Sequence, residues 1–503
     1  MDKDVMIKKL SKLPPSWVDF LERKVLDKIP SVKKEIEKQT NDMMADIETN
    51  LRPYDGRYDK FTEFPKEGVS REKITSWMKE MMDEESQRWN GGFCSGTVYH
   101  GYPEHIDFMN EIYSITSQTN PLHSDLFPSI AKFEAEIISM TANMLGAKNC
   151  SDKVCGSVTS GGSESIMMAM KSYRDRARKE RGITKPEMVI PITAHVAFNK
   201  AAEYFNIKVR TIPMDENYQV DVKKLEKAIN VNTIVIVGSA PTFPQGAIDP
   251  IPELSRIAKK YNIGLHVDSC LGGFILPWVK KLGYDMPDFD FSLSGVTSIS
   301  ADTHKYGFAA KGTSVILYRD ENLRSYQYFT YTEWPGGIYF SPTMTGSRPG
   351  ALSAACWASL VSIGEQGFMD IAKNIMNTAD TIKKGIAEMP ELKILGKPYY
   401  NISFTSDEFN IFEILDIMGE KKWNLNGLIR PDCVHICLTN AHTKPGVAER
   451  FVSDLKEAVV IAKNNPSKKE GGMAPIYGLA STMPLRGTVS QLLKKYMDAL
   501  YKV

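Results

Sequence analysis

The sequence predicts an α/β protein whose central sheet is mostly parallel and is covered by helices. Short apolar runs of strand length alternate with amphipathic helical stretches through the middle of the chain. A strand at residues 233–237 precedes a helix at 252–261, and another strand follows at 263–268. This order is typical of a βαβ unit, whose strands are parallel and buried on both faces.

The other elements follow from the same patterns. A helix begins near Ile166, because Ile166, Ala169, Met170 and Tyr173 form one apolar stripe. Further strands are predicted at 188–192, 296–301 and 313–318. We expect three parts: an N-terminal helical segment at 1–90, a large domain at 91–360 and a smaller C-terminal α+β domain at 361–503.

Helical spacing also marks the first part of the chain, where apolar residues recur between 17 and 29. We interpret this stretch as a helix packed on the body or on a partner subunit; the alternative is a membrane-surface helix. A polar, breaker-rich loop is predicted at 464–472.

Composition excludes several classes of function. The 503 residues include 62 Lys and Arg against 61 Asp and Glu, a net charge of +1 that provides no polycationic surface for nucleic acid. No apolar run approaches the ~18 residues of a transmembrane helix, and we expect no signal peptide because the first residues lack an apolar stretch. The seven scattered cysteines suit a reducing compartment, so we expect a cytoplasmic enzyme.

A glycine pair opens the helix that contains Ile166, in the run Thr-Ser-Gly-Gly-Ser-Glu-Ser at 159–165. Backbone N–H groups at such a start can bind an anion, and Ser160 and Ser163 add hydroxyl groups beside Gly162. The Gly-Lys-Ser/Thr ending of a nucleotide-binding loop is absent from this run. The alternative is a serine-capped helix with no ligand.

Two further candidates follow predicted strands. Asp268 ends the strand at 263–268, with His266 on the same face, and Lys305 follows the strand at 296–301. A lysine amine becomes a nucleophile when its surroundings lower its pKa. Alone, Asp268 could simply cap the next segment, and Lys305 could be a solvated surface group.

Together, these features predict a site for pyridoxal 5'-phosphate. Lys305 would form the Schiff base, Asp268 would keep the pyridine nitrogen protonated, and the glycine-serine run would hold the phosphate. His195, which follows the strand at 188–192, is the candidate for the ring face.

Several segments resemble a known group of pyridoxal-phosphate enzymes, the aspartate-aminotransferase fold (fold type I), decarboxylase branch, and within it the sphingosine-1-phosphate lyase family. The resembling segments are 95–99, 120–123, 159–165, 266–274, 298–307, 336–342, 346–350 and 474–478. Ser163 and Ser269 depart from the family, where Thr and Ala are common.

The resemblance implies roles for further residues. His304 would lie at the cofactor, and Tyr99, His123 and Lys311 would lie around the substrate's phosphate and hydroxyl. Gly346 and Ser347 would come from a second subunit, which implies a homodimer with shared active sites.

The activity implied is retro-aldol cleavage of a phosphorylated sphingoid base to a long-chain aldehyde and phosphoethanolamine, a lyase reaction of sphingolipid metabolism. The base could be His123, His304, Lys311 or the substrate phosphate. Arg348 could bind that phosphate or serve as a dimer contact. Eukaryotic relatives often carry a membrane anchor; we expect none here, although a peripheral or secreted-effector location is compatible with the sequence.

Two alternatives to this lyase stay open at this point. An amino-acid decarboxylase of the same fold would use Lys305, Asp268 and His195 as well, and a non-catalytic scaffold could retain the fold. Cys433, His435 and Cys437 share one predicted strand face, but neighbours on that face lie about 7 Å apart, which is awkward for one zinc ion. We therefore expect no metal.

Overall fold

The structure is a computed structural model that describes residues 51–464 and 486–502. The helix predicted at 17–29 and the resembling segment at 474–478 lie outside the described residues, as does the predicted loop after residue 464.

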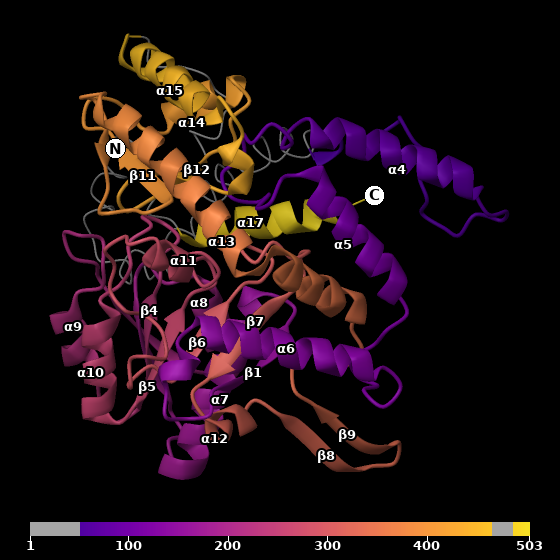
Figure 1. Cartoon of the computed structure of the whole chain (residues 1–503), viewed down its shortest axis with the longest axis vertical. Coiled ribbons are helices and arrows are strands. Elements are labelled where there is room, and N and C mark those ends of the chain that lie inside the picture. Colours follow the sequence, from indigo (N-terminus) through magenta and orange to yellow (C-terminus); the bar gives the residue numbers. More distant parts are fainter. Residues whose placement is uncertain (1–50, 465–485, 503) are drawn as a thin grey trace, which may run out of the picture.

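A seven-stranded sheet forms the centre of the larger body (Figure 1). Its strand order is β1-β7-β6-β5-β4-β2-β3, and all neighbours are parallel except β7, which runs antiparallel to β1 and β6. The predicted mostly parallel sheet is confirmed. The strands are β1 (Cys155–Thr159), β2 (Glu187–Pro191), β3 (Lys208–Ile212), β4 (Thr233–Ser239), β5 (Gly264–Asp268), β6 (Ser298–Ala301) and β7 (Ser314–Tyr318).

Helices cover both faces of this sheet. Val235 and Val237 of β4 pack with Met170 and Phe198 on one face, whereas Ile236 packs with Leu254 on the other. This alternation explains why β4 reads as a continuous apolar run. The helices that surround the sheet are α6 (Pro128–Met144), α7 (Gly162–Arg181), α8 (Ala197–Phe205), α9 (Val222–Ala228), α10 (Ile251–Tyr261), α11 (Leu276–Lys281) and α12 (Glu321–Ser325), with the short η2 (Ala147–Asn149) beside α6.

Local chemistry sets the ends of several helices. Prolines occupy the first turns of α6 and α10, where a missing N–H costs no intrahelical bond. Gly182 and Asn262 adopt left-handed backbone angles and end α7 and α10. Helix α10 matches its predicted range of 252–261 within one residue, and α7 begins four residues before Ile166.

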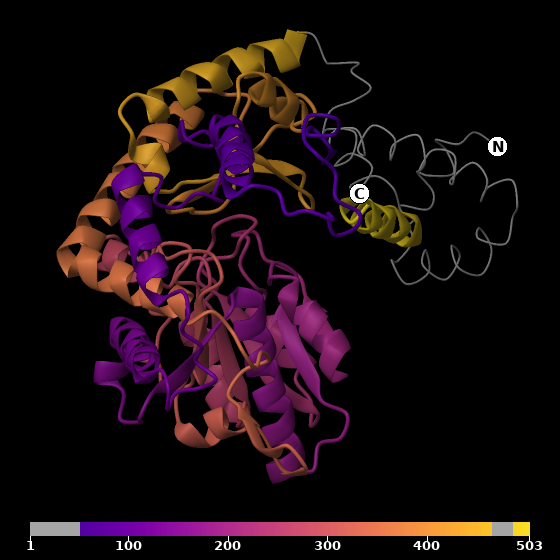
Figure 2. The ribbon, with the colours of Figure 1, turned by 90° about the vertical axis from the view of Figure 1, so that its right-hand side faces the viewer.

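A smaller four-stranded antiparallel sheet lies above the larger body (Figure 2). One face of it packs Ile402 and Ile436 against Phe451, and its other face turns His435 toward the loop after β4. The Nδ1 of His435 donates to the Pro244 carbonyl at 3.0 Å. The elements are β10 (Lys393–Ile394), β11 (Asn401–Thr405), β12 (Asn426–Leu428), β13 (Cys433–Cys437), α14 (Glu413–Glu420), η3 (Asn440–Thr443) and α15 (Val447–Asn464).

The long α13 (Gly350–Ala387) connects the two bodies. Its backbone departs from helical angles at Gly364, four residues after the predicted domain boundary at 360. The three-part division stays a prediction.

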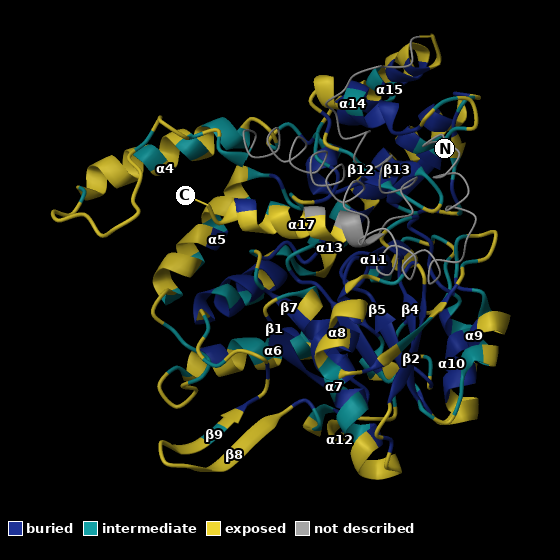
Figure 3. Ribbon diagram, turned by 180° about the vertical axis from the view of Figure 1, so that it is seen from behind, coloured by how far each residue is buried: buried dark blue, intermediate teal, exposed yellow. Residues whose placement is uncertain are grey.

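Three elements extend from the body (Figures 1 and 3). They are α4 (Arg71–Ser86), which has no buried residue, α5 (Pro103–Thr116), and a hairpin of β8 (Phe329–Trp334) with β9 (Gly337–Ser341). The last described helix is α17 (Arg486–Leu500). None of the helices in the described ranges combines the length and apolar character needed to cross a bilayer.

Candidate functional site

The predicted site residues meet where the central strands end. Asp268 is the last residue of β5 and pairs with Ser300 of β6. The chain continues from β6 into Asp302 and Lys305. Because β5 and β6 are parallel neighbours, Asp268 and Lys305 lie at the same edge of the sheet. Ligands of doubly wound sheets bind at this edge.

A serine and a histidine orient the Asp268 carboxylate. Its Oδ1 accepts the Cys270 N–H at 3.1 Å and the Ser300 hydroxyl at 3.3 Å. Because Ser300 donates its proton to Asp268, it accepts from the Nε2 of His266 at 3.2 Å, and the Nδ1 of His266 accepts from Ser298. Burial lowers the pKa of His266 to about 4. The hydrogen-bonded series from Ser298 through His266 to Ser300 therefore carries no charge before it reaches the Asp268 carboxylate.

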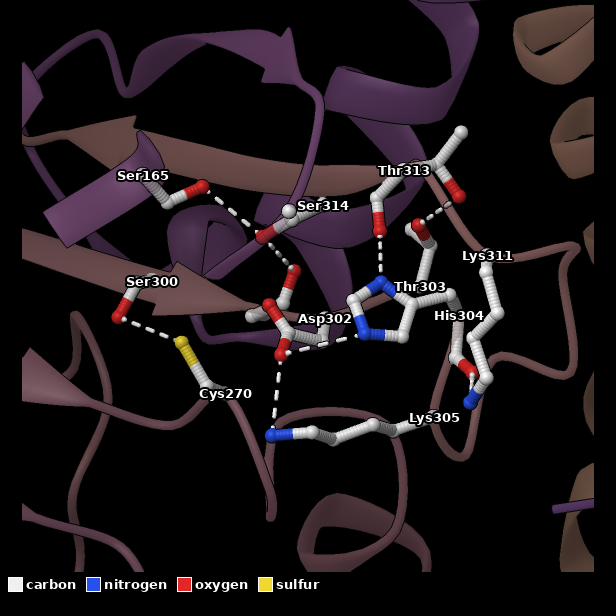
Figure 4. Close-up of polar contacts among 12 residues, drawn as sticks. Ser165, Cys270, Ser300, Asp302, Thr303, His304, Lys305, Lys311, Thr313 and Ser314 are labelled. Atoms are coloured by element: carbon white, nitrogen blue, oxygen red, sulfur yellow. Dashed lines mark hydrogen bonds and ion pairs between the residues drawn. The ribbon is translucent and has the colours of Figure 1, made fainter. Parts of the chain in front are cut away.

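Lys305 forms an ion pair that the sequence did not reveal. Its Nζ lies 3.0 Å from the Oδ2 of Asp302, three residues earlier (Figure 4). Burial works against the charged form of both groups, but their mutual attraction prevails: it raises the pKa of Lys305 and lowers that of Asp302. The lysine is therefore an ammonium in this arrangement.

His304 and Cys270 border this ion pair. The Nδ1 of His304 donates to the Thr313 carbonyl, which leaves Nε2 facing Asp302 at 3.7 Å. Burial lowers the pKa of His304 and raises that of the Cys270 thiol well above its usual value. Both side chains are neutral.

A second lysine reaches the same place. The Nζ of Lys311 lies 4.6 Å from the centroid of the Tyr99 ring and 3.4 Å from the His304 carbonyl oxygen. Partial removal from water, together with repulsion from Lys305, lowers the pKa of Lys311 to about 8. Burial raises the pKa of Tyr99, which stays a neutral phenol.

His105, for which the sequence offered no role, fixes the loop between the two lysines. Its Nε2 donates to the Phe308 carbonyl at 2.8 Å, and its ring stacks on His100 with centroids 4.0 Å apart. Phe308 has a φ of 56°, a left-handed angle that bulky residues rarely adopt. The hydrogen bond from His105 of α5 thus stabilises the unfavourable φ of Phe308 in the loop between Lys305 and Lys311.

The glycine-serine run opens α7 as predicted, but Ser160 bonds to a side chain of the protein instead of facing the expected anion site. Both the N–H and the hydroxyl of Ser160 donate to Glu164, at 2.7 and 2.6 Å, and Glu164 also accepts the Met344 N–H at 2.9 Å. No side chain caps the first turn of α7. A Cβ on Gly162 would lie 2.7 Å from the Oδ1 of Asp302. The cradle at 160–163 therefore adjoins the ion pair of Asp302 with Lys305.

Other predicted site residues have exposed side chains. His195 is exposed beyond β2, where its Nδ1 accepts the Ala197 N–H at 3.1 Å and caps α8. His123 and Ser347 are also exposed, and Asn120 joins their segments by donating to the Ser347 hydroxyl at 3.1 Å. Gly346 precedes Ser347 in the same loop. Among the described residues, no hydrogen bond or ion pair connects these segments with Lys305.

Arg348 makes a structural ion pair. Its guanidinium donates to both oxygens of Glu134, at 2.6 and 2.8 Å, and Ser353 donates to the same carboxylate. Because this bidentate pair lies within one chain, both sequence interpretations of Arg348, the phosphate ligand and the dimer contact, stay predictions.

The face of β13 carries Cys433, His435 and Cys437 as predicted. His435 bonds to Pro244 and Asn426, and the Cys437 thiol lies 3.4 Å from the Tyr306 hydroxyl. Within 51–464 and 486–502, no group of three or more His, Cys, Asp or Glu side chains is arranged to hold a metal ion.

Comparisons with known proteins find a matching family and close relatives. Residues 62–405 match the pyridoxal-dependent decarboxylase conserved domain. The chain is 50% identical to a sphingosine-1-phosphate lyase of Oryza sativa over 87% of this chain and 81% of the relative, and 46% identical to one of Dictyostelium discoideum over 96% and 90%. A solved sphingosine-1-phosphate lyase of Burkholderia pseudomallei superposes with a TM-score of 0.81 at 44% identity, covering 85% of this chain and 99% of that structure.

Proposed function

Because the chain belongs to the sphingosine-1-phosphate lyases, within the pyridoxal-dependent decarboxylase family, we propose that it cleaves phosphorylated sphingoid bases to a long-chain aldehyde and phosphoethanolamine. It is a pyridoxal-phosphate-dependent lyase of the aspartate-aminotransferase-like fold. The observation that carries the proposal is the pair of lysines, Lys305 and Lys311, in one site beside an anion cradle and Tyr99.

The residues present fit pyridoxal 5'-phosphate. The uncapped start of α7 and the absence of a Cβ at Gly162 suit a phosphate group. A buried carboxylate at the end of β5 suits a pyridinium nitrogen. We assign Lys305 as the attachment residue, Asp268 as the partner of the nitrogen, Gly162 and Ser163 as phosphate contacts, and His195 as the residue over the ring.

The chain's own residues then have distinct tasks. When bound, the cofactor supplies an electron sink for the pair released as the carbon–carbon bond breaks. The Asp268 carboxylate, oriented by Ser300 and by the Cys270 N–H, favours a proton on a nitrogen placed against it. The Nδ1 of His304 donates to the Thr313 carbonyl, which orients the ring with Nε2 toward Asp302.

The substrate's phosphate meets the second lysine. As an ammonium, Lys311 offers a cation beside the Tyr99 phenol, and a phosphate group can accept bonds from both. We assign Lys311 and Tyr99 to this headgroup. The substrate of an amino-acid decarboxylase has no phosphate headgroup that a second cation could bind.

The assembly that we propose is a homodimer with shared active sites. On the β8–β9 hairpin, Phe329, Trp334, Ile338 and Phe340 are all more than half exposed. A two-stranded ribbon gains little stability alone, and such apolar exposure is typical of an interaction surface. The loop that follows it carries Gly346 and Ser347, so a hairpin packed on a second copy would bring these residues and His123 to the partner's site.

We also propose a cytoplasmic location. All seven cysteines are free thiols, and Cys94 and Cys150 are only partly buried, which suits a reducing compartment.

Product identity tests the proposed reaction. The purified protein is offered a phosphorylated sphingoid base and, separately, glutamate and aromatic amino acids, and the products are identified by mass. A long-chain aldehyde with phosphoethanolamine is expected. Carbon dioxide without aldehyde would identify a decarboxylase, and no product at all would indicate a scaffold.

A further inference from the structure

Asp302 is a buried carboxylate with one oxygen unused. Its Oδ2 faces Lys305 at 3.0 Å and His304 at 3.7 Å, whereas its Oδ1 has no hydrogen-bond partner among the described residues (Figure 4). The side chain is 3% exposed. Burying a carboxylate oxygen without a hydrogen-bond partner costs folding free energy. Such a group in a folded protein therefore needs a functional explanation.

That oxygen adjoins the phosphate cradle. A Cβ placed on Gly162 would lie 2.7 Å from the Oδ1 of Asp302 and 2.8 Å from its Oδ2. An anion bound at the start of α7 would therefore lie close to a carboxylate. Two buried negative charges at such a separation do not both persist, and the carboxylate then takes up a proton.

The proton has one evident source. Of the groups that face Asp302, the His304 imidazole, the Cys270 thiol and the Tyr99 phenol are neutral, and Ser314 supplies only a hydroxyl. Two ammonium groups remain. Lys305 lies in direct contact with the carboxylate, whereas Lys311 contacts Tyr99 and the backbone of His304 instead.

We propose that Asp302 is a latch that keeps Lys305 protonated until a phosphate group occupies the cradle at 160–163. The inference rests on the assignment of Lys305 as the attachment residue. An ammonium is not a nucleophile, so the amine becomes reactive only once the phosphate is seated. Attachment is thereby restricted to aldehydes that arrive with a phosphate group.

The step balances. Lys305 gives one proton to Asp302, and the positive and negative charges both disappear. The free amine attacks the aldehyde carbon; its two remaining protons leave with the aldehyde oxygen as water when the carbon–nitrogen double bond forms. The O–H of Asp302 can then donate to a phosphate oxygen instead of repelling it.

Supplying the aldehyde and the phosphate separately tests the latch. Full-length protein freed of cofactor is mixed with pyridoxal, which lacks the phosphate, with and without inorganic phosphate at pH 7. Borohydride traps the product, and peptide mass gives the rate of modification at Lys305. Phosphate should accelerate modification of the wild type at least about tenfold, the change that one pKa unit gives in the amine fraction. Asp302→Asn should react at least about tenfold faster than the wild type without phosphate and respond less than about twofold to it.

Equal rates for Asp302→Asn and the wild type without phosphate, or equal phosphate acceleration of both, would overturn the latch. Asp407→Asn, which removes an exposed carboxylate paired with Lys393, should behave as the wild type. If Asp302→Asn does not fold, phosphate should still shift the pH midpoint of wild-type modification downward by at least about one unit, and an unchanged midpoint overturns the proposal. Modification at a lysine other than Lys305 refutes the site assignment itself, which is a separate failure.

Discussion

The ammonium of Lys311 lies over the ring of Tyr99, with 4.6 Å between Nζ and the ring centroid. Tyr99 in turn meets the edge of Tyr306 at 5.1 Å between centroids, and Tyr306 is the neighbour of Lys305. Lys305 raises the cost of charge on Lys311, and Asp302 offsets it in part; Asp302 makes its direct ion pair with Lys305, at 3.0 Å.

Substrate binding should therefore weaken as the pH rises through about 8. The lowered pKa of Lys311 means that its ammonium, the proposed phosphate ligand, is lost above this value and present below it. We expect kcat/KM to fall through this range, chiefly through a rise in KM, in a profile measured from pH 6 to 10.

The matched variants are Lys311→Arg and Lys311→Gln. Arginine keeps its charge throughout, so the fall near pH 8 should disappear, and glutamine should raise KM by about tenfold or more. A fall that persists unchanged in Lys311→Arg contradicts the assignment. An increase in kcat through the same range would make Lys311 a base instead.

Replacing Asp268 by Asn should reduce turnover far more than cofactor content. The carboxylate stabilises charge that develops during reaction, and loss of one such group typically costs about 10² to 10³ in kcat. Cofactor stoichiometry from absorbance and kcat from aldehyde release check this. Ser300→Ala, which removes one orienting bond to Asp268 and the acceptor of the His266 Nε2 but keeps the carboxylate, should cost less. Near-normal turnover in Asp268→Asn would refute the role of this residue.

Mixed dimers test the shared site. Lys305→Ala and His123→Ala are each expected to be inactive as homodimers. If His123 serves the partner's site, a dimer with one copy of each variant has one intact site and about half of wild-type turnover. Differently tagged chains, purified as mixed dimers, provide the measurement. An inactive mixed dimer would mean that each site is built from a single chain.

Arg319 should be a large single contributor to stability. Its buried guanidinium donates to the carbonyls of Phe291, Leu293 and Val296 and to the Asp152 carboxylate at 3.1 Å, which fixes the segment before β6. Removing the guanidinium leaves three backbone carbonyls without their donor, at about 1–3 kcal/mol for each buried unsatisfied group.

Arg319→Met should accordingly lower the thermal midpoint by about 5 °C or more. The control is Arg256→Met, whose exposed pair with Glu253 contributes under about 1 kcal/mol. Equal midpoints for the two variants would contradict the account of Arg319.

Periodicity predicted the sheet well and the loops poorly. Strands β4 and β5 were predicted to within two residues because each is a buried run bounded by turn residues. The positions of Asp268 and Lys305 followed from strand ends. Asp302 and His105 were missed because their roles depend on the register of β5 with β6 and on the left-handed turn at Phe308, neither of which local sequence specifies.

Side-chain bonding also changed the interpretation of the cradle. The sequence offered Ser160 as a phosphate ligand, but its hydroxyl donates to Glu164, and Glu164 ties the cradle to Met344 across 180 positions. No spacing rule predicts a contact between segments so far apart. The same limit applies to His123 and Ser347, whose proposed task requires a second copy of the chain.

The most direct measurement is the mass of the peptide that contains Lys305 after the purified, cofactor-loaded protein is reduced with borohydride. The account predicts that this peptide alone gains the mass of the reduced cofactor and that Lys305→Ala has neither this adduct nor the visible absorbance band. An unmodified Lys305 peptide in the presence of excess cofactor, or an adduct on any other lysine, would contradict it.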